Sequence, residues 1–209
     1  MKFIKLISLL MSVLIACLAG ANVAGASPSG WTPELTSTTT EAQNLTDRWV
    51  QSLGVSTPLW SRIESGSTAC DGNIAYGIFY CPPRATVYIT PSGISSWVAL
   101  VGFAGAVYQT GHEATHHLQV LANSYVVSNV AVENQGYCGS GVFMKWLVRQ
   151  GMIGDVIVRY FMDVMPQITI GDETHMPGPI TAAFRIGYES GDLATCVPLG
   201  IALAGVPAK

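Results

Sequence analysis

Residues 94–121 read ISSWVALVGFAGAVYQTGHEATHHLQVL and form the longest apolar-periodic stretch of the chain. Apolar side chains recur at helical spacing along most of this stretch, so it predicts a helix. Three glycines, Gly102, Gly105 and Gly111, lower its helix propensity. They indicate that another backbone packs closely against this helix, or that the helix breaks near one of them.

The end of the stretch, residues 111–117, carries a metal-binding pattern. His112 and His116 are four residues apart, so a helix presents both imidazoles on one face, where each can bind one ion at about 2.0–2.1 Å. Glu113 then lies beside the open coordination position, where a carboxylate can accept a proton from an activated water. The alternative is a solvated polar face, but three of the four histidines fall in this segment and the glutamate has the required spacing.

His117 points about 100° away from His116 around the helix. We therefore expect it to pack, or to support a ligand, rather than to bind the metal. A second apolar-periodic run spans residues 130–148 and predicts a second helix. A catalytic zinc needs a third protein ligand, and an antiparallel return of the chain would bring Glu133 to the two histidines. The spacing alone is equally compatible with Glu133 as an ordinary glutamate on the protein surface.

The remaining pattern predicts a mainly α (α+β) domain with a small β element. Residues 74–90 contain two alternating runs separated by Cys81-Pro82-Pro83, which is typical of a pair of strands. Further helices are predicted at residues 45–53, where Gly54 ends the helix, at 156–165 and at 179–188.

The N-terminus indicates export. Residues 1–26 carry two lysines near their start, at positions 2 and 5, continue with an apolar run and match a secretory signal. Two processing routes fit: cleavage after Ala26, or lipidation at Cys17, which would tether the chain to a membrane surface. Residues 27–43 are rich in Ser, Thr, Pro and Gly and predict a flexible lead, leaving 44–209 as the domain. We expect an extracytoplasmic protein, either secreted or lipid-anchored.

The cysteines agree with export. With Cys17 set aside, the chain has an even set, namely Cys70, Cys81, Cys138 and Cys196, and an oxidising compartment permits two disulfides. Four cysteines allow three connectivities, of which local pairing joins Cys70 to Cys81 and Cys138 to Cys196. No Cys-x-x-Cys pair occurs, which disfavours a cysteine-based zinc site.

Charge gives no sign of a nucleic-acid partner. Charged residues are 11% of the chain and the formal net charge is −3, so neither a basic surface for nucleic acid nor an acidic tail is indicated. Contact with a membrane is expected only through a lipid at Cys17. The partner must therefore be sought at a site, and the histidine motif predicts a peptide or protein substrate.

Four stretches resemble the neutral zinc metallopeptidases of bacteria. They are Phe79-Tyr80-Cys81-Pro82 with Val87-Tyr88-Ile89, the run from His112 to Gln119, the run from Glu133 to Cys138, and the run from Phe184 to Gly191 with Cys196. They follow the order of the family's motifs and cover about residues 70–198. The resemblance implies a zincin-like metallopeptidase domain, one Zn²⁺, and Glu133 as third ligand.

One position departs from the family's pattern. Tyr137 stands where the second-helix motif has an aspartate, which is suited to orient a zinc-binding histidine. A zinc-bearing binding or scaffold protein without turnover is therefore the alternative function, and an exported structural protein without metal is a third. His175 is a candidate to steady an oxyanion, although a lone loop histidine is more often solvated.

Overall fold

A computed structural model describes residues 30–123, 130–165 and 177–199. The predicted signal segment with Cys17, and His175, lie outside the described residues. The fold is mainly helical with a small β part, as the sequence predicts. The helices are α2 (Pro33–Ser52), α3 (Pro91–Val101), α4 (Phe103–Leu121), α5 (Val130–Arg149), α6 (Asp155–Val164) and α7 (Pro177–Ser190), and the strands are β1 (Leu59–Arg62), β2 (Ser67–Ala69), β3 (Asn73–Ala75), β4 (Ile78–Cys81) and β5 (Thr86–Ile89).

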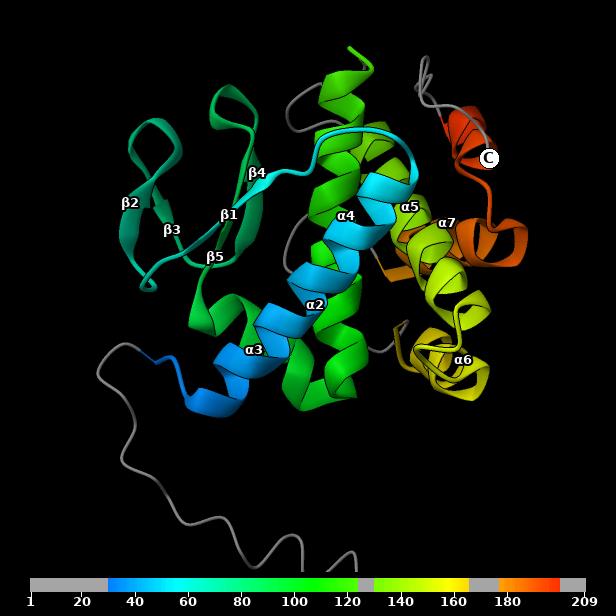
Figure 1. Cartoon of the computed structure of the whole chain (residues 1–209), viewed down its shortest axis with the longest axis horizontal. Coiled ribbons are helices and arrows are strands. Elements are labelled where there is room, and N and C mark those ends of the chain that lie inside the picture. The colour runs from blue at the N-terminus through cyan, green and yellow to red at the C-terminus, as the bar shows by residue number, and fades with distance from the viewer. Residues whose placement is uncertain (1–29, 124–129, 166–176, 200–209) are drawn as a thin grey trace, which may run out of the picture.

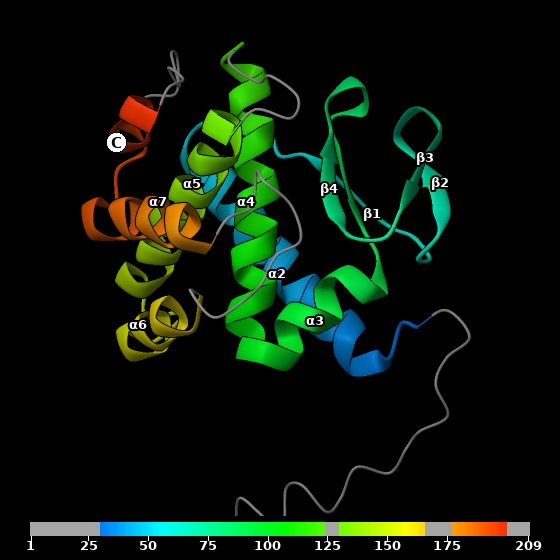
Figure 2. The ribbon, with the colours of Figure 1, turned by 180° about the vertical axis from the view of Figure 1, so that it is seen from behind.

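Helix α4 occupies the middle of the molecule, between the strands on one side and α5, α6 and α7 on the other (Figures 1 and 2). The predicted helix 94–121 is broken at Gly102, whose φ of 62° is one that glycine adopts readily. A Cβ at Gly105 would clash with the carbonyl oxygen of Trp97, so α3 folds back closely onto α4. Both the break and the close packing that the glycines indicate are present.

The prediction of a flexible lead over residues 27–43 is wrong from Pro33 onward. Helix α2 begins there, with Thr32 as its cap accepting a 3.1 Å hydrogen bond from the backbone N–H of Leu35. The Thr39 hydroxyl donates to the carbonyl of Leu35, and both side chains are buried. Packing of α2 against α4 outweighs the low helix propensity of its threonines.

The strands form two small sheets. The predicted pair of strands is present as β4 and β5, which pair antiparallel, although the start of the first predicted run forms β3 in the other sheet. Strand β1 also joins β5 in parallel, giving the order β1-β5-β4. A separate antiparallel pair joins β2 and β3. The short β1 and β2 show too little alternation to be recognised from sequence. Strand β4 lies at the edge of its sheet and contacts α4.

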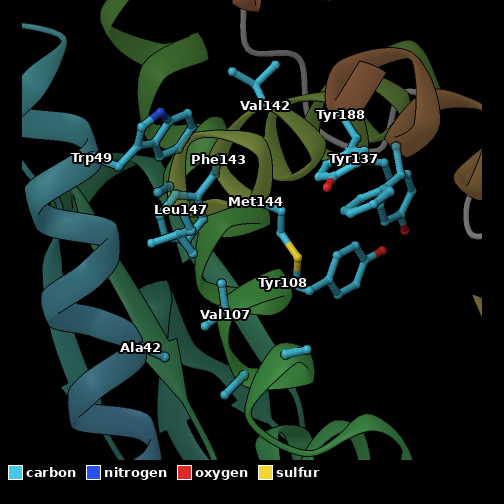
Figure 3. Close-up of a cluster of buried hydrophobic side chains, with 14 of the residues drawn as sticks. Ala42, Trp49, Val107, Tyr108, Tyr137, Val142, Phe143, Met144, Leu147 and Tyr188 are labelled. Atoms are coloured by element: carbon cyan, nitrogen blue, oxygen red, sulfur yellow. The ribbon is translucent and has the colours of Figure 1, made fainter. Parts of the chain in front are cut away.

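The core lies between α2, α4, α5 and α7 (Figure 3). Trp49 of α2 stacks on Phe143 of α5, with ring centroids 4.9 Å apart. A Cβ at Gly141 would clash with the carbonyl of Phe184, and one at Gly187 with the carbonyl of Cys138. Helices α5 and α7 therefore cross backbone to backbone, which fixes α5 against the rest of the molecule.

Two disulfides are formed, between Cys70 and Cys81 and between Cys138 and Cys196, so the local pairing is confirmed. They fit an oxidising, extracytoplasmic compartment. Among the described residues, none of the helices is both long and apolar enough to span a membrane.

We expect loss of the Cys138–Cys196 bond to cost more stability than loss of Cys70–Cys81. The two bonds span 58 and 11 residues. Loop-closure entropy then gives about 4 kcal/mol for the longer loop and about 3 kcal/mol for the shorter one. Urea unfolding of the two paired Cys→Ala variants measures the difference. A larger loss for the short loop would contradict this order.

Candidate metal site

Helices α4 and α5 bring His112, His116 and Glu133 together. The Nε2 atoms of the two histidines are 3.0 Å apart, and Glu133 Oε2 is 3.2 Å from Nε2 of His112 and 3.6 Å from Nε2 of His116. Both histidines are buried, and the side chain of Glu133 is 15% exposed. The chain thus returns antiparallel after α4 and places Glu133 where the sequence predicts it.

These distances fit a single small cation. Two ligand atoms on a tetrahedral zinc at 2.0–2.1 Å lie about 3.3 Å apart, and the three observed separations lie on either side of this value. Burial opposes ionisation of Glu133, but hydrogen bonds with His112 and His116 outweigh it and hold the pKa of this carboxyl well below its usual range. Among the described residues, the site therefore offers two imidazoles and one carboxylate to a metal ion.

Glu113 lies beside this group without belonging to it. Its side chain is buried and is hydrogen-bonded by the backbone of Tyr80 on β4. Burial raises the pKa of Glu113 to about 8; the His116 charge lowers it and the Glu133 charge adds to the rise. A carboxyl with this pKa can both accept and release a proton near neutral pH.

A cavity of about 280 Å³ reaches His112, Glu113 and Tyr137. It is bounded by the turn before β4, by the first residues of α3 and by α4. The other lining residues are Tyr76, Gly77, Ile78, Ser92, Gly93, Ser96, Trp97 and Gln109. Four of the described lining residues carry a titratable side chain: Glu113, His112, Tyr76 and Tyr137. Apart from Glu113 and His112, the described residues that line the cavity are therefore uncharged.

Tyr137 is buried against His112. Its ring centroid is 4.5 Å from that of His112, and it stacks on Tyr108 at 6.3 Å with an interplanar angle of 6°. Tyr137 follows Glu133 by four residues, so α5 presents both side chains to the site. An aromatic ring fills the place where the family's motif has a carboxylate.

His117 points away from the cluster. Its Nε2 donates to the carbonyl of Ser56 at 2.9 Å, so Nδ1 accepts from the hydroxyl of Tyr80 at 3.0 Å. Burial lowers the pKa of His117 and favours the neutral ring. Its role is to join α4 to β4 and to the segment before β1.

Sequence reasoning missed two buried glutamines near the cluster, Gln119 on α4 and Gln135 on α5. His116 Nδ1 is 2.7 Å from Gln119 Oε1, and Gln119 Nε2 is 2.9 Å from Gln135 Oε1. Spacing gives a sequence signal for Gln119, which follows His116 by three residues on nearly the same helix face.

Gly136 lets α5 approach the two histidine rings. A Cβ at this position would lie 2.7 Å from Cε1 of His112 and 3.2 Å from Cε1 of His116. Such contacts require the rings or α5 to move. The glycine therefore has a steric role in the geometry of the cluster.

We expect Gly136→Ala to weaken zinc binding by about 10–100-fold, the scale on which groups supporting metal ligands act. Alanine stabilises a helix by about 1 kcal/mol relative to glycine, which partly offsets the destabilisation caused by the contact of its Cβ with the two rings. Chelator competition measures the affinity. Gly154→Ala is the control because its Cβ would meet nothing closer than 3.7 Å. Equal affinity in the two variants would contradict the steric role of Gly136.

The chain was compared with protein-family models, curated proteins and solved structures, and none of them matches it. The residues of the cluster, their geometry and the motif that they form are therefore what indicates a function.

Proposed function

We propose that the protein is an exported zinc-dependent peptidase, with Zn²⁺ held by His112, His116 and Glu133 and with Glu113 as general base. The observation that carries this proposal is the meeting of two imidazoles and a carboxylate from two helices within 4.8 Å of one another. A second buried carboxyl lies next to them, at a cavity. Catalytic zinc sites with two histidines and one glutamate are a known arrangement.

The proposed reaction is hydrolysis of a peptide bond. Zinc, when bound, supplies Lewis-acid activation of a water and of the carbonyl under attack. Glu113 accepts the proton of that water and returns it to the leaving amine. A nearby cation would lower the pKa of Glu113 from about 8, which favours the carboxylate needed to accept the proton. Hydrogen bonding to Tyr80 holds this side chain in place.

A zincin-like fold and kinship with the neutral zinc metallopeptidases are part of the same proposal. The histidine motif on α4, its position beside the edge strand β4 and the order of the resembling stretches support them. The two disulfides support an extracytoplasmic location.

Tyr137 favours a second candidate, a zinc-bearing binding or scaffold protein without turnover. A phenol is neutral at pH 7, so it brings no charge to raise the basicity of His112. Its ring lies directly against that histidine, in the position of the family's aspartate. The site can thus hold metal with less support for catalysis.

We expect the protein to hydrolyse members of a quenched fluorescent peptide library. Chelation should abolish the hydrolysis, and one equivalent of zinc should restore it. A zinc-loaded protein that cleaves no library member would instead support the scaffold function. A protein that binds no zinc at all would overturn both.

A further inference from the structure

Two fully buried glutamines, Gln119 and Gln135, connect the histidine cluster to the C-terminal part of the fold. A buried amide is costly unless its N–H groups and its oxygen find partners. Here the partners come from α4, from α5 and from Cys196, which is joined by a disulfide to Cys138 on α5.

Backbone carbonyls determine which way both amides face. Gln135 Nε2 donates to the carbonyl of Cys196 at 3.3 Å, and Gln119 Nε2 donates to the carbonyl of Val132 at 3.0 Å. A carbonyl can only accept, so neither amide can be flipped without placing two oxygens against each other. Gln119 Nε2 also donates to Gln135 Oε1 at 2.9 Å.

This orientation determines the protonation of His116. Oε1 of Gln119 faces Nδ1 of His116 at 2.7 Å, the shortest hydrogen bond of the series. An amide oxygen cannot donate, so Nδ1 of His116 carries the proton of this hydrogen bond. Nε2 therefore faces His112 and Glu133, and it is the nitrogen left to bind a metal ion when the ring is neutral.

We propose that Gln119 is a positioning residue of the metal site, which selects the Nδ1–H tautomer of His116 and fixes its ring for binding through Nε2. Gln135, anchored on Cys196, keeps the amide of Gln119 in the required orientation. The inference rests on the proposed zinc function for its purpose, but the tautomer is a property of the metal-free protein.

The test uses Gln119→Met, which keeps the length of the side chain and removes both hydrogen-bonding groups. Gln43→Met is the matched control, because Gln43 is also buried and its amide oxygen accepts from Arg62, outside the cluster. Long-range ¹H–¹⁵N imidazole spectra of the metal-free proteins, recorded at a pH at which the ring is neutral, report the His116 tautomer. Chelator competition reports zinc affinity.

We expect Nδ1–H in the wild-type protein and in Gln43→Met, and a shift toward the Nε2–H form in Gln119→Met. Zinc affinity should fall by about 10–100-fold in Gln119→Met alone. If that variant does not fold, Gln135→Met replaces it in the test. This variant leaves Gln119 in place but removes its support, so the tautomer and the zinc affinity should change in the same direction by a smaller amount. An Nε2–H tautomer in the wild-type protein would overturn the proposal. So would an unchanged tautomer and affinity in whichever of the two variants folds. If zinc does not bind the wild-type protein, the proposed function fails, while the tautomer result still decides the role of Gln119.

Discussion

Glu113→Gln is expected to lower kcat/KM for peptide hydrolysis by about 10²–10⁴-fold, the contribution of a positioned general base. The amide has nearly the same shape as the carboxyl but cannot accept the proton of the attacking water. Because Glu113 is not among the three clustered ligands, the variant should keep its zinc. Steady-state kinetics and metal analysis of the same sample measure both effects.

Glu133→Gln is the matched control, since the same chemical change is made 20 residues later on the facing helix. It should lose most of its zinc, because a neutral amide is a poor replacement for the carboxylate ligand. The two glutamates are thus predicted to have separate roles, which one experiment can distinguish. Loss of zinc in Glu113→Gln, or an unchanged rate, would remove Glu113 from the mechanism.

His116→Ala is expected to weaken zinc binding by more than about 100-fold, beyond the effect of losing a supporting group. It removes one of the three ligand atoms and leaves His112 facing Glu133 alone. Competition with a chelator of known affinity gives the change in Kd.

His117→Ala provides the control from the adjacent position. It removes the hydrogen bonds to Ser56 and Tyr80 but no atom of the cluster. We expect a loss of stability of about 1–3 kcal/mol with zinc affinity nearly unchanged. Equal losses of zinc in the two alanine variants would show that the effect comes from general disruption of α4.

The long helices were predictable because each buries one continuous face. Helix α5 was predicted over 130–148 and spans Val130–Arg149, and α6 was predicted within two residues at each end. Helix α2 was predicted only from Leu45, because the threonines before it have low propensity and are held by tertiary contacts. The hydrogen bond from Thr46 to Thr110 on α4 is one such contact, and no local pattern reveals it.

The candidate site was predictable where its residues share one helix. The spacing of His112, Glu113 and His116 predicts their arrangement, and the return of the chain places Glu133. Gln119 and Gln135 were not recognised because their importance depends on partners that only the fold brings together. A buried glutamine and a solvated one look the same in a sequence.

The central claim, a zinc ion bound between α4 and α5, is tested most directly by X-ray diffraction from zinc-grown crystals at the zinc absorption edge. We predict one strong anomalous peak about 2.0–2.2 Å from Nε2 of His112, from Nε2 of His116 and from a carboxylate oxygen of Glu133. An anomalous map with no peak among these three side chains, from crystals in which they are well ordered, would contradict the account.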